Sequence, residues 1–389
     1  MMKNIGVVTG TRAEYGLLRP LIKKIDAAGG LNLTLIVTGM HLSPEFGLTY
    51  REIEADGFKI DKRIEMLLSS DTPGGVLKSM GLELIAFADY LAEKNIDMIV
   101  LLGDRYESFV AAAAALFFGI PIAHIHGGES TEGAVDEALR HSITKMSAIH
   151  FAATEVYRRR IIQLGEQTDS VYNVGALGIE NIKEMPLLDK KAIESFIGLT
   201  FETPVFMVTY HPVTMEKFTA QKQMEDLLSA LDHYQDCKII FTKANSDVGG
   251  RIINQLIDNY AASHADRCAV FVSMGQLRYF SALNYCSMVI GNSSSGIIEA
   301  PSFHIPTVNI GDRQKGRVCA KSVIHCGTDT KDIIEAIQNA FGLIRSECLK
   351  HVDNPYEKKG TSDEMIFYIE KYLNNKVNTK KKFNDITFC

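Results

Sequence analysis

The sequence predicts an α/β protein made of two Rossmann-like, doubly wound domains. Short apolar runs alternate with segments of helical period along most of the 389 residues, and polar, glycine-containing motifs follow many of these runs directly. The alternation stops between Glu180 and Thr203, where the chain is polar and carries Pro186, and then it starts again. Such alternation is typical of parallel sheets with helices on both faces. A chain of this length accommodates two such domains.

The first half contains six runs that are apolar and short enough to be buried parallel strands. They are Ile5–Val8, Leu33–Val37, Met98–Leu102, Ile122–Ile125, His150–Ala153 and Val171–Val174. The uncharged, alanine-rich stretch Phe109–Ala123 is shorter than the roughly 20 residues of a membrane span and is interrupted by Gly119 and Pro121. We expect a buried, alanine-rich helix over Phe109–Phe118 and a buried strand over Pro121–Ile125.

The second half repeats the pattern and predicts a second, similar sheet. Its strands are expected at Val205–Thr209, Lys238–Phe241, Ala269–Val272, Met288–Ile290 and Thr307–Ile310. Asp363–Tyr372 has helical spacing. We therefore predict an N-terminal domain over residues 1–180, a C-terminal domain over 181–362, and a C-terminal helix and tail over 363–389.

Composition excludes several classes of protein. The formal net charge is −6 and no basic stripe is visible, which argues against nucleic acid as a partner. The N-terminus passes from Lys3 into the first strand without an apolar leader, so we expect a cytoplasmic protein that has no membrane partner. The seven cysteines are scattered and form no C-x-x-C pair, which predicts reduced thiols and no zinc site. They are Cys237, Cys268, Cys286, Cys319, Cys326, Cys348 and Cys389.

The richest stretch for chemistry is Met288–Arg317. A strand breaks there at Gly291, and the polar Asn292–Gly296 opens a helix. Free backbone N–H groups, the hydroxyls of Ser293 and Ser294, and the helix dipole make this junction a candidate anion site. We expect Glu299 on the first turn of that helix, where a carboxylate could accept hydrogen bonds from ribose hydroxyls.

A second strand then delivers Gly311–Arg317, which holds Arg313, Lys315 and Arg317 between glycines. This pattern favours a clamp for nucleotide phosphates. The plainer interpretation of both motifs is a helix N-cap followed by a solvated basic turn.

Other candidate residues follow strands of the first half. Arg12, in Gly10–Gly16, lies where a helix begins and could reach a diphosphate, although a capped helix start explains it too. Asp104 follows the third strand beside Arg105, as a base or as a surface ion pair.

His126 and Glu129 end the next strand, and Asp136 follows on a helix, where it could pair with Arg140 one turn later. In the second half His211 follows a strand. Acids and histidines after adjacent strands suit general acid–base work, which needs two groups in opposite roles.

These motifs together resemble the hydrolysing UDP-N-acetylglucosamine 2-epimerases, and most of all the bacterial branch that feeds sialic-acid and related nonulosonic-acid synthesis. The resemblance rests on GTRAEYG, LGDRYE, HIHGGE, GNSSSGIIE and GDRQKGR, in that order along nearly the whole chain. It implies two domains facing a cleft, as in GT-B-type glycosyltransferases, with the C-terminal helix crossing back to the first domain. It also implies a homodimer or homotetramer.

Carried over residue by residue, the resemblance implies an acid–base set and a nucleotide-binding set. The first is Asp104, Asp136 and His211; the second is Ser293, Ser294, Glu299 and Arg313, with Arg12 near the diphosphate. Animal-type relatives have a catalytic glutamate where this chain has His126, so either His126 takes that role or Glu129 moves into it.

The resemblance predicts conversion of UDP-N-acetylglucosamine and water to N-acetylmannosamine and UDP, through elimination of UDP and hydration of a glycal. A UDP- or GDP-linked N,N'-diacetylbacillosamine, used for legionaminic-acid synthesis, is the alternative substrate. No metal-ligand spacing is visible, so we expect neither a metal nor another cofactor. A GT-B glycosyltransferase, which would need an acceptor, and a nucleotide-sugar sensor without turnover are more remote alternatives.

Overall fold

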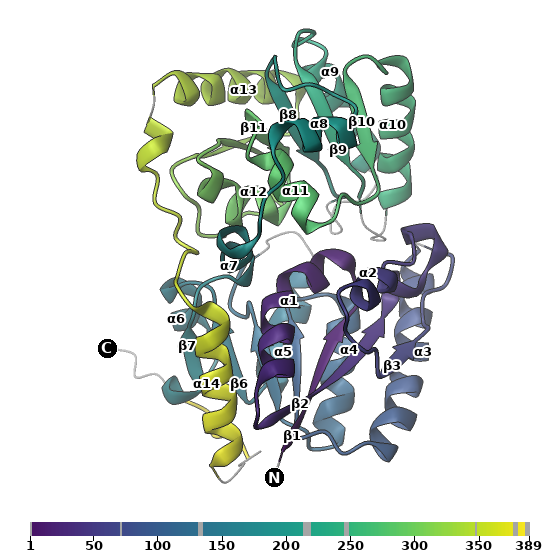
Figure 1. Ribbon diagram of the computed structural model, residues 1–389, viewed down its shortest axis with the longest axis vertical. Helices are drawn as coiled ribbons and strands as arrows, with labels where there is room; N and C mark the ends of the chain where they lie inside the picture. Colours follow the sequence, from purple (N-terminus) through teal and green to yellow (C-terminus); the bar gives the residue numbers. More distant parts are fainter. Residues whose placement is uncertain are drawn as a thin grey trace. The chain divides into compact units, whose positions relative to one another are not determined.

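Two all-parallel sheets organise the chain in the computed structural model (Figure 1). The structure describes residues 2–70, 72–130, 135–212, 219–244, 249–346, 348–375 and 380–385. The chain divides into two compact units. Unit 1 comprises Met1–Glu129, Asp136–Asn181 and Tyr356–Cys389, and unit 2 comprises Ser130–Val135 and Ile182–Pro355. The domain boundaries predicted after residues 180 and 362 stay predictions; in the structure the chain joins unit 1 again at Tyr356.

Unit 1 is built on a seven-stranded sheet of order β3-β2-β1-β4-β5-β6-β7. Its strands are β1 (Lys3–Thr9), β2 (Leu31–Thr38), β3 (Lys62–Ile64), β4 (Met98–Leu102), β5 (Ile122–Ile125), β6 (Ile149–Ala152) and β7 (Val171–Asn173). Its helices are α1 (Arg12–Ala27), α2 (Tyr50–Ala55), α3 (Pro73–Glu93), α4 (Tyr106–Phe117), α5 (Val135–Met146), α6 (Glu155–Gln163) and α14 (Thr361–Asn374), while α7 (Leu177–Glu184) begins in unit 1 and ends in unit 2.

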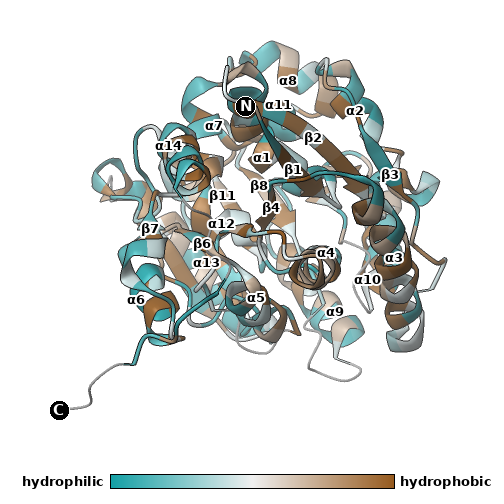
Figure 2. Cartoon of the chain, turned by 90° about the horizontal axis from the view of Figure 1, so that it is seen from below, coloured by the Kyte–Doolittle hydropathy of each residue, from teal (hydrophilic) through white to brown (hydrophobic). Residues whose placement is uncertain are grey.

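Alternate residues of the central strands of unit 1 enter two different cores. Ile5 and Val7 pack in the core that α1 and α14 cover, whereas Val8 packs in the core that α3 and α4 cover. Both faces are therefore buried, which explains why these strands are continuous apolar runs. In Figure 2 the hydrophobic colour accordingly runs along β1 and β2.

The helix expected to be buried over Phe109–Phe118 is only partly so. In the structure α4 starts earlier, at Tyr106, and four of its five alanines are buried. Its last turn is exposed, with Phe117 90% accessible. The prediction of a buried helix was wrong for this last turn, because an uncharged stretch does not distinguish core from an exposed apolar surface.

Unit 2 is built on a six-stranded sheet of order β10-β9-β8-β11-β12-β13. Its strands are β8 (Val205–Thr209), β9 (Lys238–Thr242), β10 (Cys268–Phe271), β11 (Met288–Gly291), β12 (Thr307–Ile310) and β13 (Val323–Cys326). Its helices are α8 (Lys190–Ile197), α9 (Ala220–Leu231), α10 (Gly250–Ser263), α11 (Gln276–Leu283), α12 (Ser294–Ile298) and α13 (Thr330–Arg345).

The strands of unit 2 also alternate between two cores. Phe206 and Val208 of β8 face the core of α9, α10 and α13, whereas Val205 and Met207 face the core that holds α8 and α11. The doubly wound α/β fold predicted from the sequence is confirmed for both units. In the part of the chain that the structure describes, no helix is long and apolar enough to span a membrane.

Candidate active site

Each sheet reverses its strand order once, and the candidate residues follow the strands at these reversals or the strands next to them. In unit 1 the reversal lies between β1 and β4, and in unit 2 between β8 and β11. Ligands of open α/β sheets bind at the carboxyl ends of the strands beside such a reversal.

Asp104, directly beyond β4, forms an ion pair with Arg140 of α5. The Arg140 guanidinium is almost fully buried and also lies 3.9 Å from Glu137 of the same helix. The sequence suggested that Arg140 could pair with Asp136, one turn earlier. The structure shows Arg140 paired with Asp104, which follows β4. The ion pair with a buried guanidinium gives the Asp104 carboxylate a fixed orientation.

His126 and Glu129, beyond β5, lie side by side. His126 Nδ1 is 2.9 Å from Glu129 Oε1, and both side chains are nearly inaccessible. Among the residues that the structure describes, His126 Nε2 is buried without a hydrogen-bond partner. The backbone of His126 has a φ of 63°, a left-handed conformation that is uncommon outside glycine and recurs at functional sites. At this distance the carboxylate charge favours a proton on Nδ1, which leaves the Nε2 lone pair able to accept a proton.

His124 supports the turn that carries Asp104. Its Nε2 lies 2.7 Å from the carbonyl oxygen of Gly103. A carbonyl only accepts, so Nε2 carries the proton and Nδ1 accepts from the Thr144 hydroxyl at 3.2 Å. Burial lowers the pKa of His124 to about 3, so this histidine is neutral and structural.

Arg12 begins α1 and pairs with Glu52 of α2, with its Nε 2.6 Å from Oε2. The adjoining His41 is a satisfied core residue, because its two ring nitrogens meet the hydroxyls of Thr9 and Thr49 at 3.1 and 2.8 Å. His41 is thus explained by its structural role. Arg12 stays a candidate residue for binding a ligand.

A group of buried carboxyls lies under the ends of β1 and β4, and none of them was given a role from the sequence. Glu14 accepts from Gly10 N–H at 2.6 Å and from the Ser108 hydroxyl at 3.2 Å. Burial raises the pKa of Glu14 to about 7, and the neighbouring Glu107 carboxylate contributes to the rise. Glu107 itself is held by two hydrogen bonds from Arg105, each 3.1 Å long.

Glu83 of α3 belongs to the same group and is fully buried. Burial raises the pKa of Glu83 well above its ordinary value, and Glu107 adds to the effect. One guanidinium therefore faces several carboxyls here, and protonation keeps the group compatible with burial.

In unit 2, Asn292 directly follows β11 and links the candidate residues at the ends of β8 and β11. Its Oδ1 accepts from the backbone N–H of His211 at 2.7 Å, and its Nδ2 donates to the backbone carbonyl of His211 at 2.8 Å. The Asn292 side chain thus satisfies the backbone N–H and C=O of His211, which follows β8. These two hydrogen bonds fix the backbone position of His211.

The strand junction also requires Gly291. A Cβ atom at this position would lie 1.9 Å from the carbonyl oxygen of Thr209, and the φ of Gly291 is 132°. Only glycine lets β8 and β11 approach this closely at their ends.

The basic turn after β12 closes on the same place. Arg313 and Gln314 both donate to the backbone carbonyl of Asn292, at 3.1 and 2.8 Å. Ser293 is the N-cap residue of α12, and Ser294 is its first residue. Arg313, Ser293 and Ser294 thus lie around one short backbone segment; that this segment binds phosphate stays a prediction.

The expected position of Glu299 was wrong in one respect. We expected it on the first turn of the helix, but α12 has five residues and Glu299 comes directly after its last one. A 3₁₀ turn, Ala300–Phe303, starts there because Pro301 does not continue the α-helical hydrogen bonding. Glu299 is buried, and its charge adds to the effect of burial in raising the pKa of Tyr279, whose hydroxyl donates to Ser295 at 2.9 Å.

The two remaining candidates lie at element ends. Asp136 is half-buried on the first turn of α5, one turn before Arg140, and His211 is 7% exposed beyond β8. Sequence reasoning missed the roles of Asn292, Arg140 and Tyr279 in building the site. Asn292 alone had a local signal, since it is the first polar residue after a buried strand.

Comparison with known proteins shows the family. A family model described as UDP-N-acetylglucosamine 2-epimerase matches residues 23–370. The chain is 43% identical to the GDP/UDP-N,N'-diacetylbacillosamine 2-epimerase (hydrolyzing) of Campylobacter jejuni, over 86% of this chain and 87% of that protein. It is 37% identical to the polysialic acid biosynthesis protein P7 of Escherichia coli, over 100% of this chain and 99% of that protein.

A solved structure shows the same fold. The crystal structure of UDP-GlcNAc 2-epimerase from Neisseria meningitidis bound to UDP-GlcNAc matches with a TM-score of 0.79 and 19% identity, covering 95% of this chain and 100% of that one. The two-domain α/β fold expected from the resemblance is therefore confirmed. With strand-end motifs in both units, a family match over most of its length and relatives this similar, the chain belongs to the UDP-N-acetylglucosamine 2-epimerase family.

Proposed function

We propose that this hydrolysing nucleotide-sugar 2-epimerase acts on UDP- or GDP-linked N,N'-diacetylbacillosamine and releases 2,4-diacetamido-2,4,6-trideoxymannose and the nucleoside diphosphate. The name of the C. jejuni relative, 43% identical over most of both chains, supports this substrate. The order of the two candidates is thereby reversed from that expected from the sequence, where UDP-N-acetylglucosamine came first.

UDP-N-acetylglucosamine is the second candidate. The E. coli relative named for polysialic acid biosynthesis matches the full chain at 37% identity, and the N. meningitidis structure holds UDP-GlcNAc. The two sugars share the 2-acetamido group and the diphosphate, so both fit the same reaction at C1 and C2. They differ at C4 and C6.

The proposed reaction starts with removal of the C2 proton. The C2–H electron pair forms the C1=C2 double bond, the C1–O bond breaks, and its electron pair leaves with the nucleoside diphosphate. Water then adds its oxygen at C1 while a proton returns to C2 on the opposite face. These two proton transfers need two groups in opposite roles, which is the work of general acid–base catalysis.

The pair His126–Glu129 carries this proposal on unit 1. We assign the proton-transfer role that falls on glutamate in animal-type relatives to His126 Nε2, with Glu129 as the residue that orients the ring. Asp104, paired with Arg140, is the second acid–base candidate, with Asp136 and His211 in the same set. This assignment joins the two alternatives left open by the sequence, because the two residues act as one unit.

The residues of unit 2 that follow β11 and β12 are proposed to hold the leaving group. Arg313, the hydroxyls of Ser293 and Ser294, and their backbone N–H groups offer donors to a diphosphate, and Arg12 of unit 1 is an additional candidate. Charge that grows on the departing diphosphate is stabilised by such preorganised donors. Glu299 is proposed to accept from the ribose hydroxyls.

We also propose that the enzyme is a homodimer or homotetramer. Two neighbouring helices of unit 1 expose large apolar side chains: Leu77 and Ile85 of α3 are 66% and 64% accessible, and Leu116 and Phe117 of α4 are 51% and 90% accessible. Figure 2 shows this hydrophobic colour on α3. Apolar surface gathered in this way usually marks a protein interface.

The test is proton NMR of the purified protein in D₂O with each nucleotide sugar in turn, without an added acceptor. Turnover of a diacetylbacillosamine nucleotide, with deuterium at C2 of the free product, is expected. Turnover of UDP-N-acetylglucosamine alone would replace the first substrate by the second. Release of nucleotide only after a sugar acceptor is added would instead identify a glycosyltransferase and contradict the proposal.

A further inference from the structure

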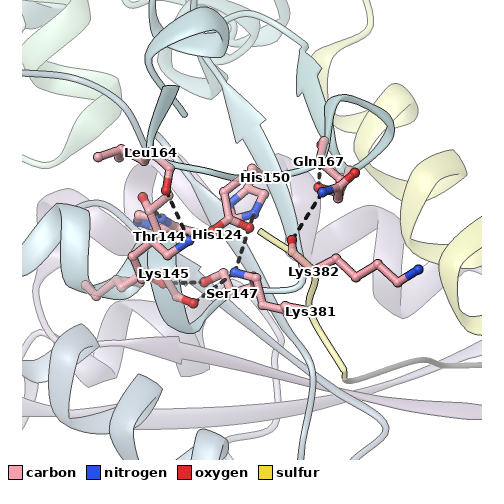
Figure 3. A network of polar contacts seen from close by, with 12 residues as sticks. His124, Thr144, Lys145, Ser147, His150, Leu164, Gln167, Lys381 and Lys382 are labelled. Atoms are coloured by element: carbon pink, nitrogen blue, oxygen red, sulfur yellow. Dashed lines mark hydrogen bonds and ion pairs between the residues drawn. The ribbon is translucent and has the colours of Figure 1, made fainter. Parts of the chain in front are cut away.

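The segment after α14 is held against unit 1 by a lysine with three acceptors. Lys381 Nζ lies 2.6 Å from Glu166 Oε2, and 2.9 and 2.7 Å from the backbone carbonyl oxygens of Lys145 and Ser147 (Figure 3). Its ammonium group therefore uses three donors on three protein acceptors. We call Lys381–Asn384 the C-terminal clasp.

Neighbouring residues of the clasp fix its backbone. The Gln167 amide donates to the carbonyl of Lys382 at 3.2 Å, and the N–H of Asn384 donates to the carbonyl of Gly165 at 2.9 Å (Figure 3 shows the first of these). The Phe383 ring lies so close to Gly165 that a Cβ there would be 2.3 Å from it, and the Lys145 ammonium lies 5.1 Å from the ring centroid. The clasp is thus a specific contact.

The acceptor of the clasp is a buried carboxylate. Glu166 is 1% exposed and also accepts from Lys145 Nζ at 2.6 Å and from His150 Nε2 at 3.1 Å. Burial alone would raise the pKa of Glu166, but the hydrogen bonds from His150, Lys145 and Lys381 outweigh it and lower that pKa to about 2. Glu166 is an anion that depends on its donors, and one of them comes from the clasp.

The clasp also closes the end of α5. Lys145 lies in the last turn of this helix and Ser147 directly follows it, so the Lys381 ammonium sits at the helix carboxyl end and satisfies carbonyls there. A cation at this end also favours the helix dipole. The end of α5 is therefore fixed by a residue more than two hundred positions later in the chain.

The same helix holds Asp104 by two routes. Arg140 pairs with the Asp104 carboxylate directly. Thr144 bonds to His124, whose Nε2–H holds the carbonyl of Gly103, the residue before Asp104. A shift or loosening of α5 would therefore reach Asp104 through its side chain and through its backbone.

From these contacts we infer that Lys381 is a positioning residue, which fixes α5 and through it the place of Asp104; the inference rests on the proposed function of Asp104. Residues remote from the reacting atoms act in this way because catalysis depends on small distances. A merely structural role would affect the stability of unit 1 and leave turnover per folded molecule unchanged.

The test compares Lys381→Met with Lys382→Met in the full-length protein. Both changes remove one ammonium from adjacent residues, but Lys382 takes part in the clasp through its backbone carbonyl, which the change preserves. We expect Lys381→Met to lower kcat by roughly ten- to a hundredfold with little change in KM, and Lys382→Met to match the wild type. Lys381→Arg keeps a cation and should recover most of the lost kcat.

Hydrogen exchange of the backbone amides supplies a readout that needs no substrate. Faster exchange in the last turn of α5 and at Gly103–Asp104 is expected for Lys381→Met relative to Lys382→Met. Unchanged exchange in both places would overturn the inference, even if the wild type turned over none of the nucleotide sugars offered. A lower melting temperature with unchanged kcat per folded molecule would overturn it as well and leave the clasp a stabilising contact.

Discussion

The Nδ1 atom of His126 lies 2.9 Å from Oε1 of Glu129, within one turn of chain that a left-handed residue begins. The arrangement places the two side chains at ion-pair distance. The charge of a carboxylate beside Nδ1 favours the tautomer whose Nε2 has a free lone pair, and it would stabilise an imidazolium formed when Nε2 takes a proton.

Changing either member of this pair should reduce turnover while preserving the fold. His126→Ala should lower kcat by about 10² to 10⁴, the usual contribution of a general acid or base. Glu129→Gln should lower kcat by at least about tenfold, since the amide can turn its NH₂ toward Nδ1 and favour the other tautomer. Steady-state kinetics with the best nucleotide sugar measures both.

Glu155→Gln is the matched control, because Glu155 makes its ion pairs with Arg158 and Arg159 on the surface of α6. Its kcat should equal that of the wild type. If His126→Ala and Glu129→Gln both stay within twofold of this control, the pair has no part in proton transfer.

Removing the Asn292 side chain should lower the stability of the protein. Asn292→Ala leaves the backbone N–H and C=O of the buried His211 without their partner. Each unsatisfied buried group costs about 1 to 3 kcal/mol, so we expect the free energy of unfolding in urea to fall by roughly 2 to 5 kcal/mol.

Asn292→Asp separates the two bonds. A carboxylate still accepts from the His211 N–H, but its other oxygen faces the His211 carbonyl that the Asn292 amide now contacts at 2.8 Å. It should therefore destabilise too, and more at pH 8 than at pH 5. Asn259→Ala, on the exposed side of α10, serves as the control. If Asn292→Ala is as stable as this control, the hydrogen bonds from Asn292 to the His211 backbone do not contribute to stability.

How much of the fold the sequence revealed depended on strand burial. β4, β5, β8 and β12 were predicted with the bounds that the structure has. Every residue of these four strands is buried, and β4 is an unbroken apolar run. The two missed strands, β3 and β13, lie at sheet edges. β3 has three residues, two of them charged, and edge strands need not be apolar on both faces.

The residues of the candidate site also fall into those that the sequence indicates and those that only the structure shows. Position after a strand pointed to Asp104, His126 and Asn292, because parallel strands bring their carboxyl ends to one edge. Which side chains pair could not be read from spacing: Arg140 is 36 residues from Asp104. Glu83, in the middle of a helix, had no signal, because its burial follows from packing against the sheet.

The buried Glu14 predicts a pH-dependent stability. Its pKa is raised from 4.5 to about 7 in the folded protein, with Glu107, Glu83 and Arg105 as the charged groups near it. The folded state binds the proton more tightly, so the contribution is complete below pH 4.5 and is lost as the pH rises through 7. The full loss is on the order of 3 kcal/mol.

Glu14→Gln should remove this dependence, because an uncharged amide still accepts from Gly10 N–H. The free energy of unfolding in urea, measured at pH 5 and pH 8, should fall with pH by less in Glu14→Gln than in the wild type. Glu155→Gln again provides the surface control. A wild type and a Glu14→Gln variant with parallel pH profiles would show that Glu14 is ionised without penalty.

The exposed apolar surface of α3 and α4 predicts how the enzyme assembles. Phe117 is 90% accessible, and a phenyl ring buried between two copies removes a large apolar area from water. The wild type should sediment as a dimer or tetramer of the 43.1 kDa chain, and Phe117→Glu should shift it toward the monomer, since the charge would be buried without a partner. Phe367→Glu on α14, at a phenylalanine that is 59% accessible and outside this surface, should keep the wild-type mass. Sedimentation velocity at micromolar concentration distinguishes the species. A monomeric wild type, or a Phe117→Glu variant as large as Phe367→Glu, would mean that this surface is not where the copies meet.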